Sequence, residues 1–191
     1  MSKKFIKGYI TEFKKVLDNL PLKNIEKAIE MIKETYSENR QIFIMGNGGS
    51  ASTASHMACD FSKGTIKNVY DYKEKRFKVI SLTDNIATIT AYSNDICYEH
   101  IFLQQLRNLL QPKDIVIAIS ASGNSPNIIL AAEYAKNLEA KVIGLTGFDG
   151  GKLLKIADCA LHIPVNNYGM AEDCHLILNH LLTSYFINFK K

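Results

Sequence analysis

Apolar side chains recur at helical spacing along the N-terminal part of the chain. Between residues 3 and 19 they lie three and four positions apart, a pattern that predicts an amphipathic helix. The pair Leu20-Pro21 ends this helix, because proline disfavours helical geometry in the residue before it. The same spacing over residues 22–38 predicts a second helix. Two helices before the first strand exceed what one α/β layer needs, so we expect their apolar stripes to pack on another subunit.

Short apolar runs rich in β-branched residues alternate with helical segments in the rest of the chain. The runs predict five strands, at residues 41–45, 77–82, 114–119, 141–145 and 159–163. The intervening segments predict helices at residues 51–63, 83–91, 98–110, 126–138, 152–157 and 171–189. Thr83 or Asp84 is the expected cap of the second of these helices, and a polar break is expected at residues 92–95. This alternation indicates an α/β fold with a five-stranded parallel sheet and helices on both faces.

No internal repeat, low-complexity tract or interdomain linker interrupts this order, so we expect a single domain over residues 1–191. Residues 1–39 would form its N-terminal helical pair, and residues 40–191 its α/β core with the C-terminal helix. With 47% hydrophobic and 22% charged residues, the composition is typical of a globular protein. The formal charge of the chain, +4, is small, and the lysines and arginines are scattered along the sequence. Both features argue against nucleic-acid binding.

Neither a membrane span nor a secretion signal is expected from the sequence. No apolar run reaches the roughly 20 residues that cross a bilayer, and no continuous apolar region follows the basic N-terminus. The cysteines lack close paired spacing, which favours free thiols in a reducing compartment: Cys59, Cys97, Cys159 and Cys174. Together these features predict a cytoplasmic protein without a membrane partner.

Two turns of glycine, asparagine and serine follow the first and third predicted strands. Their sequences are GNGGS, residues 46–50, and SASGNS, residues 120–125. In a doubly wound sheet of strand order 2-1-3-4-5 these strands are neighbours where the winding reverses, and ligands bind outside that point. The second turn would clamp a phosphate with its hydroxyls and the following helix N-terminus, through Ser120, Ser122 and Ser125. The first turn would cradle a sugar with Asn47, Gly48 and Gly49. Either turn alone could be an ordinary tight turn, but the pair favours a ligand site.

Dinucleotide binding is the rival interpretation of the first turn. Gly46, Gly48 and Ala51 satisfy G-x-G-x-x-A, but that fingerprint also needs an acidic residue about 20 positions onward, at the end of the second strand. Asp84 follows the second strand here, much farther along the chain. No Gly-Lys-Ser/Thr follows the turn either, so a nucleotide cofactor is not expected.

Ionisable residues gather on two of the predicted helices. His56 and Asp60 lie four apart and share a helix face, and Glu172 and His180 lie eight apart on the last helix. If these helices face each other, the four side chains suit a divalent metal such as zinc, or proton transfer. The alternative is that they simply face solvent. We favour solvent exposure for Asp173 and His175, the two interpretations are equally supported for His56 with Asp60, and His100 and His162 have no assigned role.

These motifs together resemble a known family. The chain combines GNGGSA-(x)4-H, S-x-S-G-N-S-x-N, LTG-x-x-GG and a C-terminal helix with an acid and two histidines. This combination resembles the sugar isomerase (SIS) domain family and, within it, the phosphoheptose isomerases, over nearly the whole chain. The resemblance implies a flavodoxin-like fold, a homotetramer with active sites at subunit interfaces, and a phosphorylated sugar substrate. Its implied reaction converts sedoheptulose 7-phosphate to D-glycero-D-manno-heptose 7-phosphate, the first step toward heptose in surface glycans.

The resemblance also assigns roles to individual positions. It implies Asp60 and His180 as the catalytic pair. A divalent metal, with zinc as the expected ion, would be bound by His56, Asp60, Glu172 and His180. The substrate would meet Asn47, Gly48, Gly49, Ser50, Asn94, Asp95, Ser120, Ser122, Ser125 and Glu172. The chain departs from the usual family pattern at three of its positions: Asp60 replaces glutamate, Glu172 replaces glutamine and Ala121 stands where threonine is common.

We therefore expect an aldose–ketose isomerase that acts through an enediol. Two other functions stay open. The departures at Asp60 and Glu172 are compatible with an isomerase of another sugar phosphate. Some members of the resembled family are not enzymes and bind a phosphosugar or a partner such as the bacterial replication initiator. A protein of that kind would not need converging histidines and carboxylates, so the expected cluster favours an enzyme.

Overall fold

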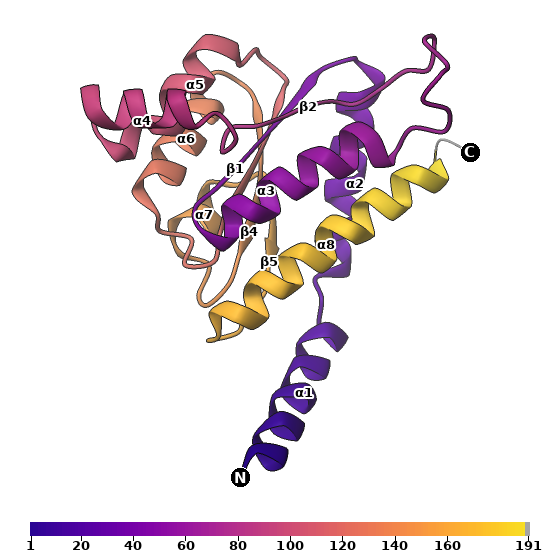
Figure 1. Cartoon of the computed structure of the whole chain (residues 1–191), viewed down its shortest axis with the longest axis vertical. Coiled ribbons are helices and arrows are strands. Elements are labelled where there is room, and N and C mark those ends of the chain that lie inside the picture. The colour runs from indigo at the N-terminus through magenta and orange to yellow at the C-terminus, as the bar shows by residue number, and fades with distance from the viewer. Residues whose placement is uncertain (190–191) are drawn as a thin grey trace.

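A five-stranded parallel sheet forms the centre of the computed structural model, which describes residues 1–189 (Figure 1). Its strands are β1 (Gln41–Gly46), β2 (Lys78–Ser81), β3 (Ile115–Ser120), β4 (Lys141–Thr146) and β5 (Cys159–His162). They lie in the order β2-β1-β3-β4-β5, which is the order under which the two turns would be neighbours, and the sheet confirms the flavodoxin-like α/β fold. The winding therefore reverses between β1 and β3. Residues 190 and 191, the end of the predicted domain, lie outside the described part of the chain.

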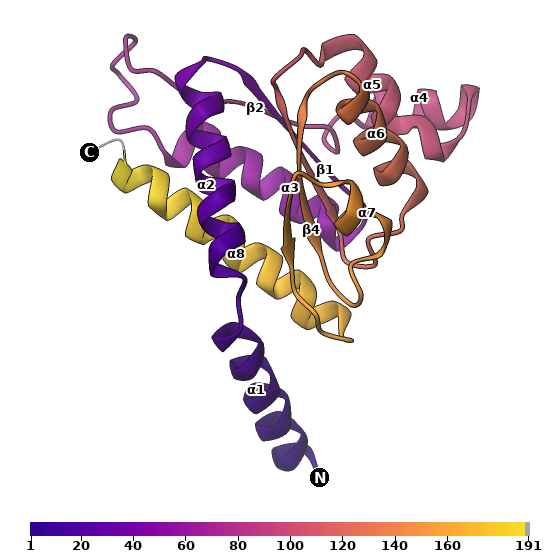
Figure 2. The same ribbon diagram turned by 180° about the vertical axis from the view of Figure 1, so that it is seen from behind.

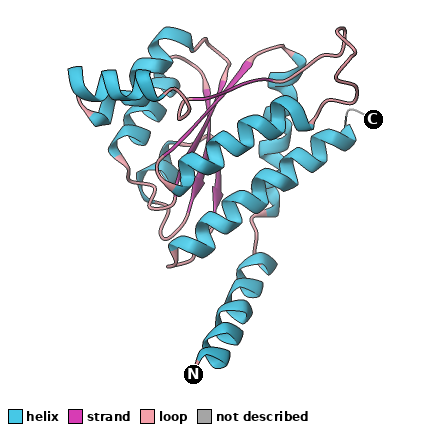
Figure 3. Cartoon of the chain, in the orientation of Figure 1, coloured by secondary structure: helices cyan, strands magenta, loops and turns pink. Residues whose placement is uncertain are grey.

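Helices cover both faces of this sheet (Figure 3). They are α1 (Ser2–Asp18), α2 (Leu22–Ser37), α3 (Gly49–Cys59), α4 (Ile86–Asp95), α5 (Ile101–Leu109), α6 (Pro126–Asn137), α7 (Gly151–Ile156) and α8 (Tyr168–Phe189). Two short helices adjoin them: the π-helix η1 (Asp60–Gly64) extends α3, and the 3₁₀-helix η2 (Tyr98–His100) precedes α5. The helix predicted at 51–63 therefore ends in a π-helical turn, and the helix predicted at 98–110 begins with a 3₁₀-helical turn.

The side chains of β1 alternate between two hydrophobic cores. Ile42 and Ile44 belong to the core under α2, α3 and α8, whereas Phe43 and Met45 belong to the core under α5 and α6. Because successive strand residues point to opposite faces, a strand covered on both sides must be apolar throughout. This explains the uninterrupted apolar run that predicted the strand.

The two leading helices have different surroundings. The apolar stripe of α2, which includes Ile25 and Ile32, is buried in the core of this same chain, so the prediction that both stripes pack on another subunit is wrong for α2. Helix α1 projects away from the sheet in both views (Figures 1 and 2) and contains no buried residue. Phe5, Ile6 and Ile10 are 73%, 54% and 48% exposed. For α1 the contact with another subunit stays a prediction.

The segment after β2 differs from the predicted one in two ways. Asn85, not Thr83 or Asp84, caps α4, since its side-chain oxygen accepts a hydrogen bond from the Thr88 backbone N–H at 3.0 Å. The Asp84 carboxylate instead accepts hydrogen bonds from the hydroxyls of Thr83 and Ser55. The predicted polar break at residues 92–95 is also absent, because α4 continues to Asp95.

Helix α8 begins three residues earlier than predicted and buries a histidine. The Asn167 side chain accepts a hydrogen bond from the Met170 N–H at 3.1 Å and so begins the helix near Tyr168. The solvent-facing position predicted for His175 is wrong, since this residue is 0% exposed. His175 follows Ala171 by four positions on the buried stripe of α8.

Within residues 1–189, no helix combines the length and apolar character needed to cross a membrane.

Candidate active site

The first glycine turn joins β1 to α3 and brings the backbone close to α8. Gly48 has a φ of +55°, a backbone conformation that residues with a Cβ rarely adopt. A Cβ on Gly49 would lie 2.6 Å from a carboxylate oxygen of Glu172. Glycine at 48 therefore permits the turn, and glycine at 49 permits α8 to approach the N-terminus of α3.

The second turn joins β3 to α6 and presents several hydroxyl groups. The Ser120 and Ser125 hydroxyl oxygens lie 3.2 Å apart, and the Ser122 hydroxyl oxygen accepts a hydrogen bond from the Asn124 N–H at 3.3 Å. Pro126 is the first residue of α6, a position that needs no backbone N–H donor within the helix. Hydroxyls and the positive end of a twelve-residue helix are thus directed to the same point.

Both turns line one pocket at the reversal point of the sheet. It has a volume of about 180 Å³ and is lined by Asn47, Ser50, Ile119, Ser120, Ala121, Ser122, Ser125, Tyr168 and Glu172. The two turns that the sequence placed at neighbouring strand ends therefore share a cavity. Hydroxyls, an amide and a helix N-terminus make this pocket suitable for a phosphate. Tyr168 is a lining residue that the sequence analysis did not find, because a lone tyrosine in a predicted loop carries no signal.

Asn47 is held in place by residues from two other segments. Its side-chain amide exchanges two hydrogen bonds with Asn127 of α6, each 2.9 Å long. The Tyr98 hydroxyl donates a third, 3.0 Å long, to the Asn47 side-chain oxygen. Asn127 is the last residue of the S-x-S-G-N-S-x-N motif, which could have singled it out. Tyr98 has no comparable signal in the sequence.

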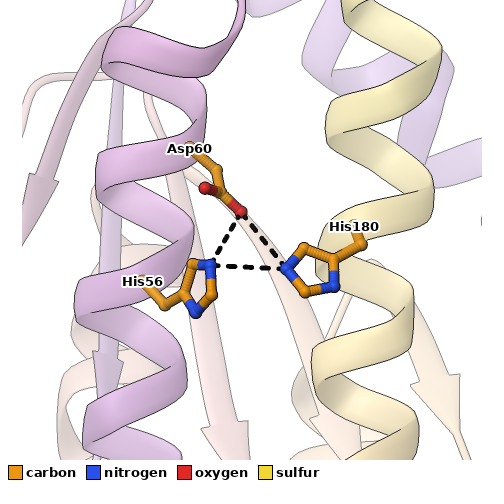
Figure 4. Close-up of side chains that lie close together, drawn as sticks. All are labelled: His56, Asp60 and His180. Atoms are coloured by element: carbon orange, nitrogen blue, oxygen red, sulfur yellow. Dashed lines mark hydrogen bonds and ion pairs between the residues drawn. The ribbon is translucent and has the colours of Figure 1, made fainter.

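A second group of polar side chains lies between α3 and α8, which run side by side in Figures 1 and 2. His56 of α3, Asp60 of the adjoining η1 and His180 of α8 point toward one another (Figure 4). The Nε2 atoms of the two histidines lie 3.3 Å apart. Asp60 Oδ2 lies 3.3 Å from the His56 Nε2 and 3.7 Å from the His180 Nε2. Three atoms that can bind a metal or exchange a proton therefore converge on one point.

The separations within this group fit a metal ion. Nitrogen and oxygen ligands about 2.0–2.2 Å from a tetrahedral zinc ion are themselves about 3.3–3.6 Å apart. Two imidazole nitrogens facing each other at 3.3 Å must either share a proton or direct both lone pairs at a cation. The side chains of His56 and His180 are 47% and 52% exposed, so a small molecule can reach them. The group can hold a divalent metal ion.

Glu172, Asn94 and Asp95 do not belong to this group. Glu172 lines the pocket beside Gly49 and is not among the residues whose ligand atoms lie within 4.8 Å of one another in the described chain. Asn94 and Asp95 lie at the exposed end of α4, where the Asn94 amide donates a hydrogen bond to Asp95 at 2.9 Å. Neither lines the pocket. Within one chain, the structure therefore brings the two turns and Glu172 to one pocket and gathers His56, Asp60 and His180 into a separate group, while Asn94 and Asp95 belong to neither.

The fold and this pocket define the class: the protein is a doubly wound α/β protein, and such proteins bind ligands outside the carboxyl ends of the strands at the reversal point. A sequence model of the SIS domain matches residues 8–147. The phosphoheptose isomerase of Helicobacter pylori strain ATCC 700392 / 26695 is 37% identical over 158 residues, which cover 83% of this chain and 80% of that protein. The phosphoheptose isomerase of Shewanella denitrificans is 38% identical and covers 83% of this chain and 80% of its own length.

Two solved structures resemble the chain over nearly its whole length. The phosphoheptose isomerase GmhA from Neisseria gonorrhoeae superposes with a TM-score of 0.88 at 26% identity, covering 97% of this chain and 98% of its own. A phosphoheptose isomerase from Francisella tularensis gives a TM-score of 0.87 at 29% identity, covering 98% and 99%. The chain belongs to the SIS domain family, and the two relatives named above, which are 37% and 38% identical to it, are phosphoheptose isomerases.

Proposed function

We propose that this protein is an aldose–ketose isomerase that converts sedoheptulose 7-phosphate to D-glycero-D-manno-heptose 7-phosphate. The product would supply heptose for a surface glycan. The observation that supports this most is the distance between the pocket at the two turns and the histidine–aspartate group, since α3 and α8 contribute residues to both. Ser50, in the pocket, precedes His56 by six residues of α3, roughly 9 Å at 1.5 Å per residue. A phosphate at the turns would therefore leave the other end of a long sugar at the histidine–aspartate group.

In this proposal the pocket binds and orients the substrate. Ser120 and Ser125 donate hydrogen bonds to the phosphate, and Asn47 meets the sugar hydroxyls beside them. Phosphate binding far from the reacting carbons contributes to catalysis when it holds those carbons against the catalytic groups. Ser122 and Glu172, which line the same pocket, complete the contacts that the family resemblance implies, together with the backbone of Gly48 and Gly49.

Asp60 and His180 carry out the proton transfers. One of them removes a proton from C1 of the ketose, which forms an enediol, and the proton is returned at C2 to form the aldose. The other group exchanges the proton between the two oxygens. The side chains of Asp60 and His180 are 23% and 52% exposed, and Asp60 Oδ2 lies 3.7 Å from the His180 Nε2. Such a separation allows both to act on adjacent atoms of one substrate.

The same group would hold a divalent metal, and we propose zinc. His56, Asp60 and His180 are the ligands that the observed separations support, and Glu172 is the fourth ligand that the resemblance implies. When bound, the ion would polarise the substrate carbonyl and stabilise the negative charge that develops on its oxygen.

We further propose that the whole chain acts as one domain within a cytoplasmic homotetramer with active sites at its interfaces. The exposed apolar residues of α1 support a contact with another subunit. Asn94 and Asp95 do not line the pocket of their own chain. In the tetramer they would contact substrate in a neighbouring subunit, which would reconcile their implied role with their position on α4.

The decisive experiment follows sedoheptulose 7-phosphate by NMR in deuterated water, with and without added zinc. We expect aldoheptose signals and deuterium at the carbon next to the carbonyl. Asp60→Asn and His180→Ala should each reduce turnover greatly while the circular dichroism spectrum stays that of the folded protein. Absence of both product and deuterium exchange would contradict the proposed reaction. Exchange with another ketose phosphate would then indicate a different sugar substrate, and retained phosphosugar binding without exchange would indicate a non-catalytic binding protein.

A further inference from the structure

A buried amide from α8 contacts the carboxylate of Asp60. The Asn179 Nδ2 donates a hydrogen bond to Asp60 Oδ2 at 2.8 Å, the shortest of the contacts that reach this oxygen. Asn179 is 0% exposed, whereas the neighbouring His180 is half-exposed. Adjacent helix residues point about 100° apart, so α8 places one of them inside the protein and the other at the site.

The orientation of the Asn179 amide follows from its two neighbours. A carboxylate only accepts hydrogen bonds, so the NH₂ group must face Asp60. The Asn179 Oδ1 then points the other way, where the Thr183 hydroxyl donates a hydrogen bond to it at 3.4 Å. Thr183 is 6% exposed. Buried side chains joined in this way have little freedom to rotate, and the amide is therefore a fixed donor.

Asp60 needs such a donor because of its place in the backbone. It is the first residue of the π-helix η1, at the junction with α3. Junctions of this kind are wider than an α-helix and are often found at functional sites. An aspartate side chain can rotate about two bonds, and rotation would move Oδ2 away from His56 and His180. The hydrogen bond from Asn179 opposes that rotation.

We propose that Asn179 is a positioning residue that fixes the Asp60 carboxylate. It directs Oδ2 toward the Nε2 atoms of His56 and His180, where a metal would be bound. Within residues 1–189, no hydrogen bond or ion pair involves the other oxygen, Oδ1. The hydrogen bond from Asn179 therefore acts on the same oxygen that faces the two histidines. This inference deepens the proposed function and rests on the metal site included in it.

The test compares zinc binding by the wild-type protein and by Asn179→Leu, which keeps a similar volume and removes the donor. Loss of a group that orients a metal ligand typically weakens metal binding by about 10–100-fold. We expect a loss of this size in a competition titration with a chromophoric chelator, without substrate present. The visible absorption of bound Co²⁺ should also change, because it depends on ligand geometry. The turnover number should fall while the KM changes little, since the turns are untouched.

Three further variants separate positioning from general stability. Thr183→Val removes only the outer hydrogen bond and should weaken zinc binding less than Asn179→Leu does. Leu178→Ala disturbs the buried face of α8 next to Asn179 and should lower the melting temperature while the folded protein binds zinc as before. In an Asp60→Ala background, Asn179→Leu should have almost no additional effect on zinc affinity, because the two side chains act through one contact.

The outcomes distinguish this inference from the proposed reaction. Unchanged zinc affinity and an unchanged Co²⁺ spectrum in Asn179→Leu would overturn the positioning role. So would an equal loss of affinity in the Asp60→Ala background. A wild-type protein that binds neither ion would overturn the inference together with the metal site. If Asn179→Leu weakens zinc binding but the wild-type protein does not isomerise sedoheptulose 7-phosphate, the positioning role stands and the proposed substrate fails.

Discussion

Asn47 and Asn127 join the two turns of the pocket through a reciprocal pair of hydrogen bonds, each 2.9 Å long. The first residue follows β1 and the second lies in α6, 80 positions later in the chain. Asn127 is 2% exposed, so water cannot replace either bond. The relative position of the two turns therefore depends on this pair.

We expect Asn127→Leu to weaken substrate binding. The variant leaves the half-buried Asn47 amide with the Tyr98 hydroxyl as its remaining partner, and a side-chain hydrogen bond contributes about 0.5–1.5 kcal/mol. The KM for the sugar phosphate should rise by about tenfold, with a smaller change in the turnover number. Tyr98→Phe is the matched control: it removes one bond at an exposed position and should change the KM less. An unchanged KM in Asn127→Leu would contradict the positioning of the turns by this pair.

The second prediction concerns the phosphate. Ser120→Ala and Ser125→Ala should each raise the KM about tenfold or more, because a hydrogen bond to a charged group contributes about 1.5–3 kcal/mol. Inhibition by inorganic phosphate should weaken in parallel, and this can be measured in the same assay. Thr90→Ala, whose hydroxyl lies on α4 and donates to the Ile86 carbonyl, serves as the control. Phosphate inhibition that survives both serine substitutions would place the anion elsewhere.

The third prediction concerns pH and stability. Burial lowers the pKa of His175 from 6.5 to about 4. As the pH falls below about 6.5, the unfolded chain binds a proton at this histidine that the folded chain does not bind, so the free energy of unfolding decreases. The loss between pH 6.5 and pH 4 should reach up to about 3 kcal/mol, at 1.36 kcal/mol per pKa unit.

Urea denaturation of the wild-type protein and of His175→Leu over this pH range measures the effect. The variant should lose less stability on acidification. Part of the slope should persist, because burial also lowers the pKa of His162, which acts in the same direction. If the free energy of unfolding fell equally with pH in the two proteins, the prediction would be contradicted. His175 would then be protonated in the folded state or accessible to water there.

The fourth prediction concerns α1. Replacing Phe5 with glutamate and Ile10 with lysine places charges on its exposed apolar face and should dissociate the proposed tetramer, as measured by light scattering. The far-ultraviolet circular dichroism should stay nearly unchanged, since α1 contributes no fully buried residue. Glu12→Gln, a substitution at an exposed polar position of the same helix, is the control. A variant of unchanged mass would show that subunits associate through another surface, or not at all.

The sequence by itself determined the order of strands and helices along the chain and showed that the two turns follow the first and third strands. These features depend on local properties that a sequence contains directly. The apolar run of β1 requires cover on both faces, and Gly48 permits a turn that other residues rarely form. The distance between two neighbouring strand ends is then set by the sheet, so the shared pocket follows from local patterns.

Only the tertiary structure decided which helix faces meet. The spacing of His56 and Asp60 indicates that they share a face, but it does not say whether that face meets solvent or α8. The rotation of α8 about its axis places His180 beside them, Asn179 beneath them and His175 in the core. That rotation results from the packing of the whole apolar stripe against the sheet, which joins residues more than a hundred positions apart. A local pattern shows which residues share one face of a helix. A site between two helices also depends on how both helices are rotated about their axes, and only the packing of the whole protein sets that rotation.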